Sequence, residues 1–224
     1  MLELSAQEAD GQSDLAAKIR SAITSGRFMP NERLIEADLA RAFDANRANV
    51  RIALAMLDQE GLVVRERNRG ARVRLVTDQE AIEIAEARQA IEAMVARQAA
   101  EQATDRDRAA LRSVMAKMQV AFTQQDLAQF SQLNADLHRT IQTIANNTTA
   151  NRLLQTLKSQ VVRLQYRAIF LPGRVAKSFA EHGKIVDAIC ANDGAAAERA
   201  MREHLTEVKD ALRLAIQTAR SARL

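Results

Sequence analysis

The sequence predicts a mainly α-helical protein, with an N-terminal winged helix-turn-helix that carries a small β-hairpin wing and a C-terminal all-α antiparallel helical bundle. Short helical patterns and two strand-like runs fill the first third of the 224 residues. From Thr77 onward, apolar residues recur only at helical spacing. The low counts of glycine, 7, and proline, 2, favour long helices over a turn-rich β fold.

The composition favours a cytoplasmic protein with an aliphatic core. Hydrophobic residues make up 47% of the chain and aromatic residues only 3%, so aliphatic helix packing must fill the core. Cys190 is the only cysteine, which excludes an intramolecular disulfide and suits a reducing compartment. The N-terminus is acidic and polar, without the apolar core of a signal peptide, and no apolar run approaches the roughly 18–20 residues of a membrane span. We therefore expect no membrane partner.

The first predicted domain spans residues 12–76 and begins with a helix that Ser13 can cap. The stretch 34–43 has the apolar face of a short helix, and a polar break follows it. Asn46 is a good N-cap for the next helix because its side-chain oxygen can accept a free backbone N–H. That helix, 47–59, has apolar residues at helical spacing and ends before a glycine suited to a left-handed cap.

Arginines mark the surface of this domain. Arg47 and Arg51 lie one turn apart, on a different face from the apolar residues of their helix. Two strand-like runs, 62–64 and 71–75, are joined by an arginine-rich loop around Gly70. Between residues 41 and 74, eight arginines stand against four acids, a net charge of +4 that equals the formal excess of the whole chain.

Such a basic segment is the electrostatic footprint that DNA binding needs, and it predicts a double-stranded DNA operator as a partner. The second helix would enter the major groove, with its N-terminal residues meeting base edges and phosphates. The alternative is that two helices and a hairpin simply pack together, with the arginines as a solvated face.

Residues 18–76 resemble the DNA-binding domain of the GntR family of bacterial transcription regulators. The positions that match the pattern of this family are Ile23, Gly26, Pro30, Glu32–Leu34, Leu39–Ala40, Arg47, Val50–Arg51, Ala53–Leu54, Leu57, Glu60–Val63, Arg69–Gly70 and Val73. The family usually has a Gly-Val-Ser-Arg-Thr-Pro run into the recognition helix, whereas this chain has Asp-Ala-Asn-Arg-Ala-Asn at residues 44–49. The predicted DNA-binding residues are Arg33, Asn46, Arg47, Asn49, Arg51, Arg69 and Gly70.

The second predicted domain spans residues 78–220 and contains six amphipathic helices. The three histidines of the chain, His138, His182 and His204, all lie on apolar faces of these helices. Asn134 precedes the first of them by one turn, so its oxygen can project to the same point. Three imidazoles and an oxygen suit zinc or nickel, whereas each histidine taken singly fits a satisfied core position as well.

This second half resembles the FCD effector domain found in one GntR subfamily. The matching stretches are Arg88–Glu92, Asn134–His138, Ala145–Asn147, Arg174–His182, Ile185, Ala188–Ile189, Asp193, Ala200–Met201 and His204–Leu205. The resemblance implies effector binding, dimerisation and a divalent metal, zinc or nickel, held by Asn134, His138, His182 and His204. Metal-binding members usually have aspartate where this chain has Asn134, so its site lacks that negative charge.

Arg88 shares a helix face with apolar residues, which is an awkward place for a guanidinium unless an anion meets it. We interpret it as a contact for a small carboxylic-acid effector, with Arg167 as a weaker candidate for the same pocket. The alternatives are an intrahelical pair with Glu92 or a stem that extends to water.

These observations predict a ligand-responsive, DNA-binding transcription regulator, in the form of a homodimeric repressor. A regulator without a small-molecule effector is the main alternative. A metal-dependent hydrolase or lyase is the other, but we find no nucleophile–base pair and expect no acidic residue beside the histidines. We therefore expect no enzymatic activity.

Overall fold

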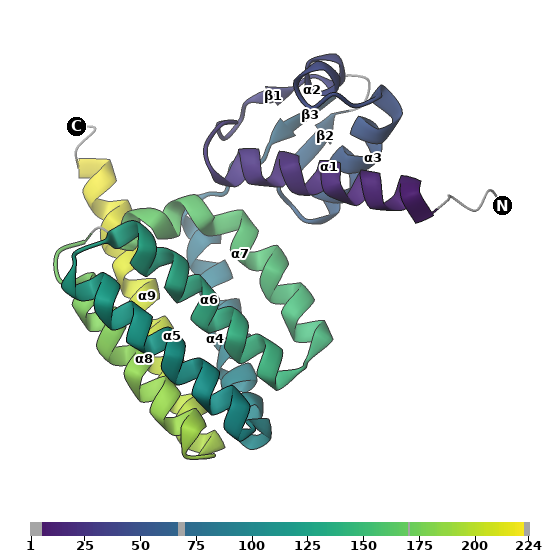
Figure 1. Cartoon of the computed structure of the whole chain (residues 1–224). Helices are drawn as coiled ribbons and strands as arrows, with labels where there is room; N and C mark the ends of the chain where they lie inside the picture. The colour runs from purple at the N-terminus through teal and green to yellow at the C-terminus, as the bar shows by residue number, and fades with distance from the viewer. Residues whose placement is uncertain (1–5, 67–69, 170, 222–224) are drawn as a thin grey trace. The chain divides into compact units, whose positions relative to one another are not determined.

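The computed structural model describes the backbone of residues 6–66, 70–169 and 171–221 (Figure 1). Side chains are described for residues 14–65, 70–160, 171–219 and 221. The chain folds into two units, each with its own core. One comprises residues up to Thr77 together with Lys158–Arg163, and the other comprises Asp78–Leu157 and Leu164–Leu224.

The first unit is a winged helix-turn-helix. Its elements are α1 (Ala6–Thr24), β1 (Arg33–Leu34), α2 (Glu36–Ala42), α3 (Arg47–Gln59), β2 (Val63–Glu66) and β3 (Gly70–Val73). The three strands form an antiparallel sheet in the order β1-β3-β2, and Arg72 of β3 stands between Arg33 and Val64. The apolar faces of α1, α2 and α3 share one core with the sheet; its largest fully buried side chains are Ile19, Leu34, Leu54 and Leu57.

Two details of this unit differ from the prediction. The first helix begins at Ala6 and not at Ser13. Leu34, predicted to start the second helix, lies in β1 opposite Ala71 and is 1% exposed. A strand of two residues is too short to produce an alternating pattern, so helical spacing alone assigned Leu34 to the helix that follows.

The ends of α3 are formed as predicted. The side chain of Asn46 accepts a hydrogen bond from the backbone N–H of Asn49 at 2.7 Å, which makes it the N-cap. At the other end Gly61 has a φ of +69°, and the N–H of Leu62 donates to the carbonyl of Leu57 at 2.9 Å. This pairing across a left-handed residue is the Schellman arrangement, which satisfies the last carbonyls of the helix.

Six helices follow Thr77 in the described residues, as predicted: α4 (Asp78–Gln102), α5 (Asp105–Thr123), α6 (Leu127–Ala145), α7 (Thr148–Ile169), α8 (Arg174–Cys190) and α9 (Gly194–Ser221). Helix α4 packs on α9, α6 and α8, and α8 also packs on α9 and α5 (Figure 1). Alanines of α4, including Ala81, Ala93, Ala96 and Ala99, are fully buried and allow close approach of these neighbours. Within the described residues, no helix is long and apolar enough to cross a membrane.

Candidate metal centre and nucleic-acid interface

The N-terminal end of α3 presents the first group of predicted site residues. Arg47 and Asn46 are exposed, and Asn49 is half-buried. The free N–H groups and the dipole of a helix N-terminus attract phosphate oxygens, and an exposed arginine at the same end adds a full positive charge. Because Asn46 uses its side-chain oxygen for the cap, its amide N–H₂ is the part left for DNA.

Arg51, one turn further along α3, is held by a residue of α2. Its Nε lies 3.0 Å from Oε2 of Glu36, while the arginine side chain keeps 60% of its surface exposed. Because the contact is made through Nε and most of the side chain is exposed, N–H donors of the guanidinium remain accessible to DNA. The sequence prediction placed Arg51 at the interface but did not identify Glu36 as its partner.

Two further predicted DNA-binding residues, Arg33 and Gly70, lie in the sheet. Arg33 is exposed on β1. Gly70 has a φ of +85°, and a Cβ added there would lie 2.8 Å from the carbonyl oxygen of Leu34. Gly70 thus allows β3 to approach β1 closely, which is a structural reason for a glycine at this position. Arg69, also predicted, lies outside the described residues.

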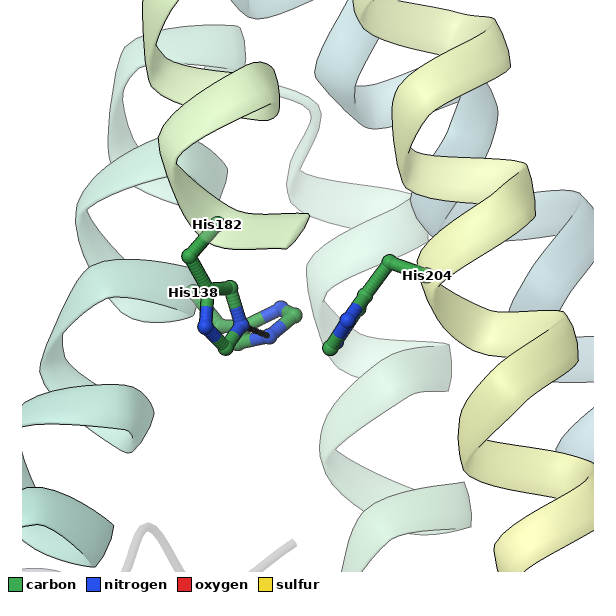
Figure 2. Close-up of side chains that lie close together, drawn as sticks. All are labelled: His138, His182 and His204. Carbon is green, nitrogen blue, oxygen red and sulfur yellow. Dashed lines mark hydrogen bonds between the residues drawn. The ribbon is translucent and has the colours of Figure 1, made fainter. Parts of the chain in front are cut away.

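The three histidines meet inside the second unit. His138 of α6, His182 of α8 and His204 of α9 are 7%, 0% and 3% exposed. One ring nitrogen of each lies within 4.8 Å of one from each of the others, and Figure 2 shows the three side chains converging from their helices. The Nε2 atoms of His138 and His182 are 3.3 Å apart. The sequence prediction that all three face inward is confirmed.

Each imidazole is also bound through its other nitrogen. Nδ1 of His138 lies 2.8 Å from Oε2 of Glu92 on α4. Nδ1 of His204 lies 2.7 Å from Oε2 of Glu181 on α8. Nδ1 of His182 is 3.4 Å from the hydroxyl of Ser178, one turn earlier on its own helix. These contacts leave the Nε2 atoms for the centre of the cluster.

Both glutamates are paired with arginines. Arg88 donates from Nε and Nη2 to Oε1 of Glu92, at 3.0 and 2.7 Å, and both side chains are buried. Arg174 and Glu181 form a two-point pair, at 3.2 and 2.9 Å. The expectation that no acidic residue stands beside the histidines is therefore wrong. The spacing from Arg174 to Glu181 is two helical turns, a signal that the sequence does carry.

Burial and charge shift two pKa values in the cluster. Burial lowers the pKa of His182 well below 6.5, and the neighbouring His204, His138 and Arg174 act in the same direction, with Glu92 opposing them. Burial alone would raise the pKa of Glu181, but hydrogen bonds from His204 and Arg174 outweigh it and lower that pKa. His182 is thus neutral and Glu181 ionised near neutral pH.

The donor set fits a divalent metal. Neutral imidazole nitrogens are ligands that zinc and nickel accept, and two nitrogens at zinc–nitrogen distances in a tetrahedron lie about 3.3 Å apart. His138 and His182 have this separation. Asn134, one turn before His138, is half-buried.

Arg88 is buried as the intrahelical partner of Glu92, one of the alternatives raised from the sequence, and the side chain of Arg167 lies outside the described residues.

Family comparisons match both units. Residues 12–73 match the model described as "Bacterial regulatory proteins, gntR family", and residues 83–207 match the model of the FCD domain. The first match contains α2, α3 and the sheet, and the second contains all three histidines.

Individual proteins with similar sequences are transcription regulators. The chain is 28% identical over 195 residues to the HTH-type transcriptional repressor RspR of Escherichia coli K12, covering 87% of this chain and 86% of that protein. It is 26% identical over 211 residues to the HTH-type transcriptional regulator LutR of Bacillus subtilis, covering 85% and 95%.

Solved structures show the same fold. The chain superposes on E. coli McbR/YncC with a TM-score of 0.75 at 20% identity, covering 93% of this chain and 98% of that one. A putative GntR regulator from Rhodococcus sp. RHA1 gives a TM-score of 0.69 at 23% identity, covering 91% and 97%.

Proposed function

Because this chain belongs to the GntR family and carries an FCD domain, it is a DNA-binding transcription regulator, and we propose that it is a repressor controlled by a small carboxylate bound through a divalent metal. The observation that carries this proposal is the buried histidine cluster, in which one ring nitrogen of each imidazole lies within 4.8 Å of one from each of the others while each Nδ1 has its own partner. Three imidazole nitrogens that lie this close together are a ligand set that zinc and nickel accept.

The two domains have different functions in this proposal. Residues 12–76 bind the operator, and residues 78–220 bind the effector and form a homodimer. The two winged helices of such a dimer read a near-palindromic site, since operator symmetry mirrors protein symmetry. The similarity to a protein named a repressor, RspR, supports the repressor role.

Operator contacts come from α3 and the sheet. Arg47 and Arg51 meet phosphates and base edges from the N-terminal half of α3, and Asn49 reads a base, since asparagine can bond adenine bidentately. Asn46 contributes its amide donor. Arg33, Arg69 and Gly70 follow the phosphate backbone beside the wing; the complete set is Arg33, Asn46, Arg47, Asn49, Arg51, Arg69 and Gly70.

His138, His182 and His204 would hold the metal, zinc or nickel. The carbonyl oxygen of Asn134 would be a further, neutral ligand. When bound, the metal supplies a buried positive charge that attracts a carboxylate oxygen.

Arg88 supplies the second contact for the effector. Its Nη1 is buried and has no hydrogen-bond partner among the described residues, although Nε and Nη2 are both engaged by Glu92. A buried guanidinium nitrogen without an acceptor is costly, and a carboxylate oxygen would satisfy it. Arg167 stays a candidate for the same ligand. The effector acts only through different affinities for the two arrangements of the dimer.

Operator binding measured with and without small carboxylates tests this function. The DNA is first selected from a random duplex library by the purified protein, and binding is then measured with zinc-loaded protein against a panel of mono-, di- and hydroxycarboxylates. We expect at least one carboxylate to weaken binding about tenfold or more, within the usual range of allosteric coupling. Full operator binding that no carboxylate changes, with or without metal, would contradict control by a carboxylate and favour the regulator without a small-molecule effector.

A further inference from the structure

We propose that Glu92 and Glu181 are positioning residues of the histidine cluster, and that each orients one imidazole and is itself fixed by an arginine. Ser178 has a different role: its hydroxyl lets His182 carry its ring proton on Nε2 without metal and on Nδ1 with metal. The inference rests on the proposed metal centre. It assigns a task to residues of α4 and α8 that lie outside the set of ligands.

The first chain of contacts runs from Arg88 through Glu92 to His138. Oε1 of Glu92 receives both donors of Arg88, so its Oε2 is held in one place, 2.8 Å from Nδ1 of His138. An Nδ1–H that donates to this oxygen fixes the ring orientation and leaves Nε2 as a lone pair.

The second chain repeats the order with other helices. Arg174 and Glu181 of α8 form a two-point pair, and Oε2 of Glu181 lies 2.7 Å from Nδ1 of His204 on α9. Burying an arginine–glutamate pair costs desolvation energy and by itself is weak evidence for stability. Two such pairs, each ending on an imidazole, are explained by the orientation that they impose.

The two glutamates orient the imidazoles and do not simply attract a cation, because their charges are neutralised by the arginines. Arg88 offsets Glu92 and Arg174 offsets Glu181, so each pair adds no net charge beside the imidazoles. The carboxylates therefore act through the hydrogen bond, which fixes the tautomer and the orientation of the ring.

His182 is held differently. Because Nε2 of His138 is a bare acceptor, the 3.3 Å contact between the two Nε2 atoms requires His182 to carry its proton on Nε2. Its Nδ1 then accepts from the hydroxyl of Ser178, 3.4 Å away. A metal held by Nε2 would require the opposite tautomer, in which Nδ1–H donates to the same hydroxyl. A hydroxyl can serve in both states because it is donor and acceptor, whereas a carboxylate could only accept.

The test compares zinc affinity of the full-length wild type with Glu92→Gln and Glu181→Gln, measured by competition with a chromophoric chelator. Glu101→Gln is the matched control, because Arg97 and Glu101 form the same i,i+4 pair on α4 but are about half exposed, whereas Arg88 and Glu92 are buried. We expect each test variant to bind zinc about 10- to 100-fold more weakly and the control to match the wild type. Because the chains of contacts use different glutamates, either variant alone carries the test if the other does not fold.

Histidine ¹⁵N chemical shifts give a readout that a purely structural role would not move. In the zinc-free wild type we expect the proton of His182 on Nε2, and in the zinc-loaded protein on Nδ1, while His138 and His204 keep theirs on Nδ1 throughout. Ser178→Ala should weaken zinc binding and leave the tautomers of His138 and His204 unchanged.

The outcomes separate the two proposals. A wild type that binds no zinc overturns both the metal centre and this inference. A wild type that binds zinc, with Glu92→Gln and Glu181→Gln equal to the control, overturns only the positioning role. Unchanged His182 protonation on zinc binding overturns the exchange at Ser178.

Discussion

Nδ1 of His138 lies 2.8 Å from Oε2 of Glu92, and both side chains are almost completely buried. This one contact joins α4 to the histidine cluster, and it accounts for a charged pair, Arg88 and Glu92, on the apolar face of a helix. It also changes the interpretation of Arg88, because two of the three guanidinium nitrogens serve Glu92 and only Nη1 is left for a ligand.

Replacing Arg88 with methionine should destabilise the protein and abolish the carboxylate response. Glu92 would lose its buried countercharge, which costs up to about 3–5 kcal/mol in the free energy of unfolding. Urea denaturation measures this loss. The matched control is Arg97→Met, which breaks an exposed pair of the same spacing and should cost under about 1 kcal/mol. Equal losses in the two variants would contradict the role given to the buried pair.

The double variant Arg47→Ala, Arg51→Ala should lose operator binding. Removing two phosphate or base contacts is expected to weaken affinity about 100-fold or more and to reduce the salt dependence of binding. Fluorescence anisotropy at several salt concentrations measures both effects. Arg213→Ala, which removes an exposed arginine of α9, is the control and should bind as the wild type does. Undiminished binding by the double variant would rule out α3 as the recognition helix.

Glycine at position 70 is needed for the sheet. Gly70→Ala places a Cβ 2.8 Å from the carbonyl oxygen of Leu34 at a φ of +85°, so we expect a loss of at least about 1–2 kcal/mol in stability. Gly183→Ala, inside α8, meets no atom within 4 Å and should stabilise the helix by about 0.5–1 kcal/mol. Thermal unfolding compares the two, and a neutral Gly70→Ala would refute the close approach.

The stability of the metal-free protein should fall as pH drops below about 6.5. Burial holds the pKa of His182 well below that value in the folded chain, so below pH 6.5 this residue binds a proton in the unfolded chain but not in the folded chain. The loss from this group is up to about 1.4 kcal/mol per pH unit. Glu181, whose pKa is lowered, contributes in a separate window below its ordinary value of 4.5. Unfolding of chelator-treated protein between pH 7.5 and 5.5 measures the first effect, and His182→Gln should flatten it.

Local rules were enough to predict most of the fold. Helical spacing identified α3 and the six helices of the second unit, and the chemistry of Asn46 and Gly61 identified the ends of α3. The two-residue strand β1 was not predicted, because it forms only through pairing with β3, a contact that no local pattern encodes. The inward direction of the histidines followed from the same spacing, since each shares a face with apolar neighbours.

The partners of the histidines could not be read in the same way. Glu92 reaches His138 from another helix, and Glu181 precedes His182 yet binds His204. Such contacts depend on how α4, α6, α8 and α9 pack, which sequence spacing within one helix does not specify. Arg88 with Glu92 was visible as an i,i+4 pair, but its connection to His138 was not.

Metal content is the most direct test of the histidine cluster as a metal centre. Elemental analysis of purified, extensively dialysed wild type should give about one equivalent of zinc or nickel per chain, and His182→Ala should give essentially none. A metal-free wild type, or a His182→Ala variant that keeps a full equivalent, would contradict the assignment of His138, His182 and His204 as the ligands.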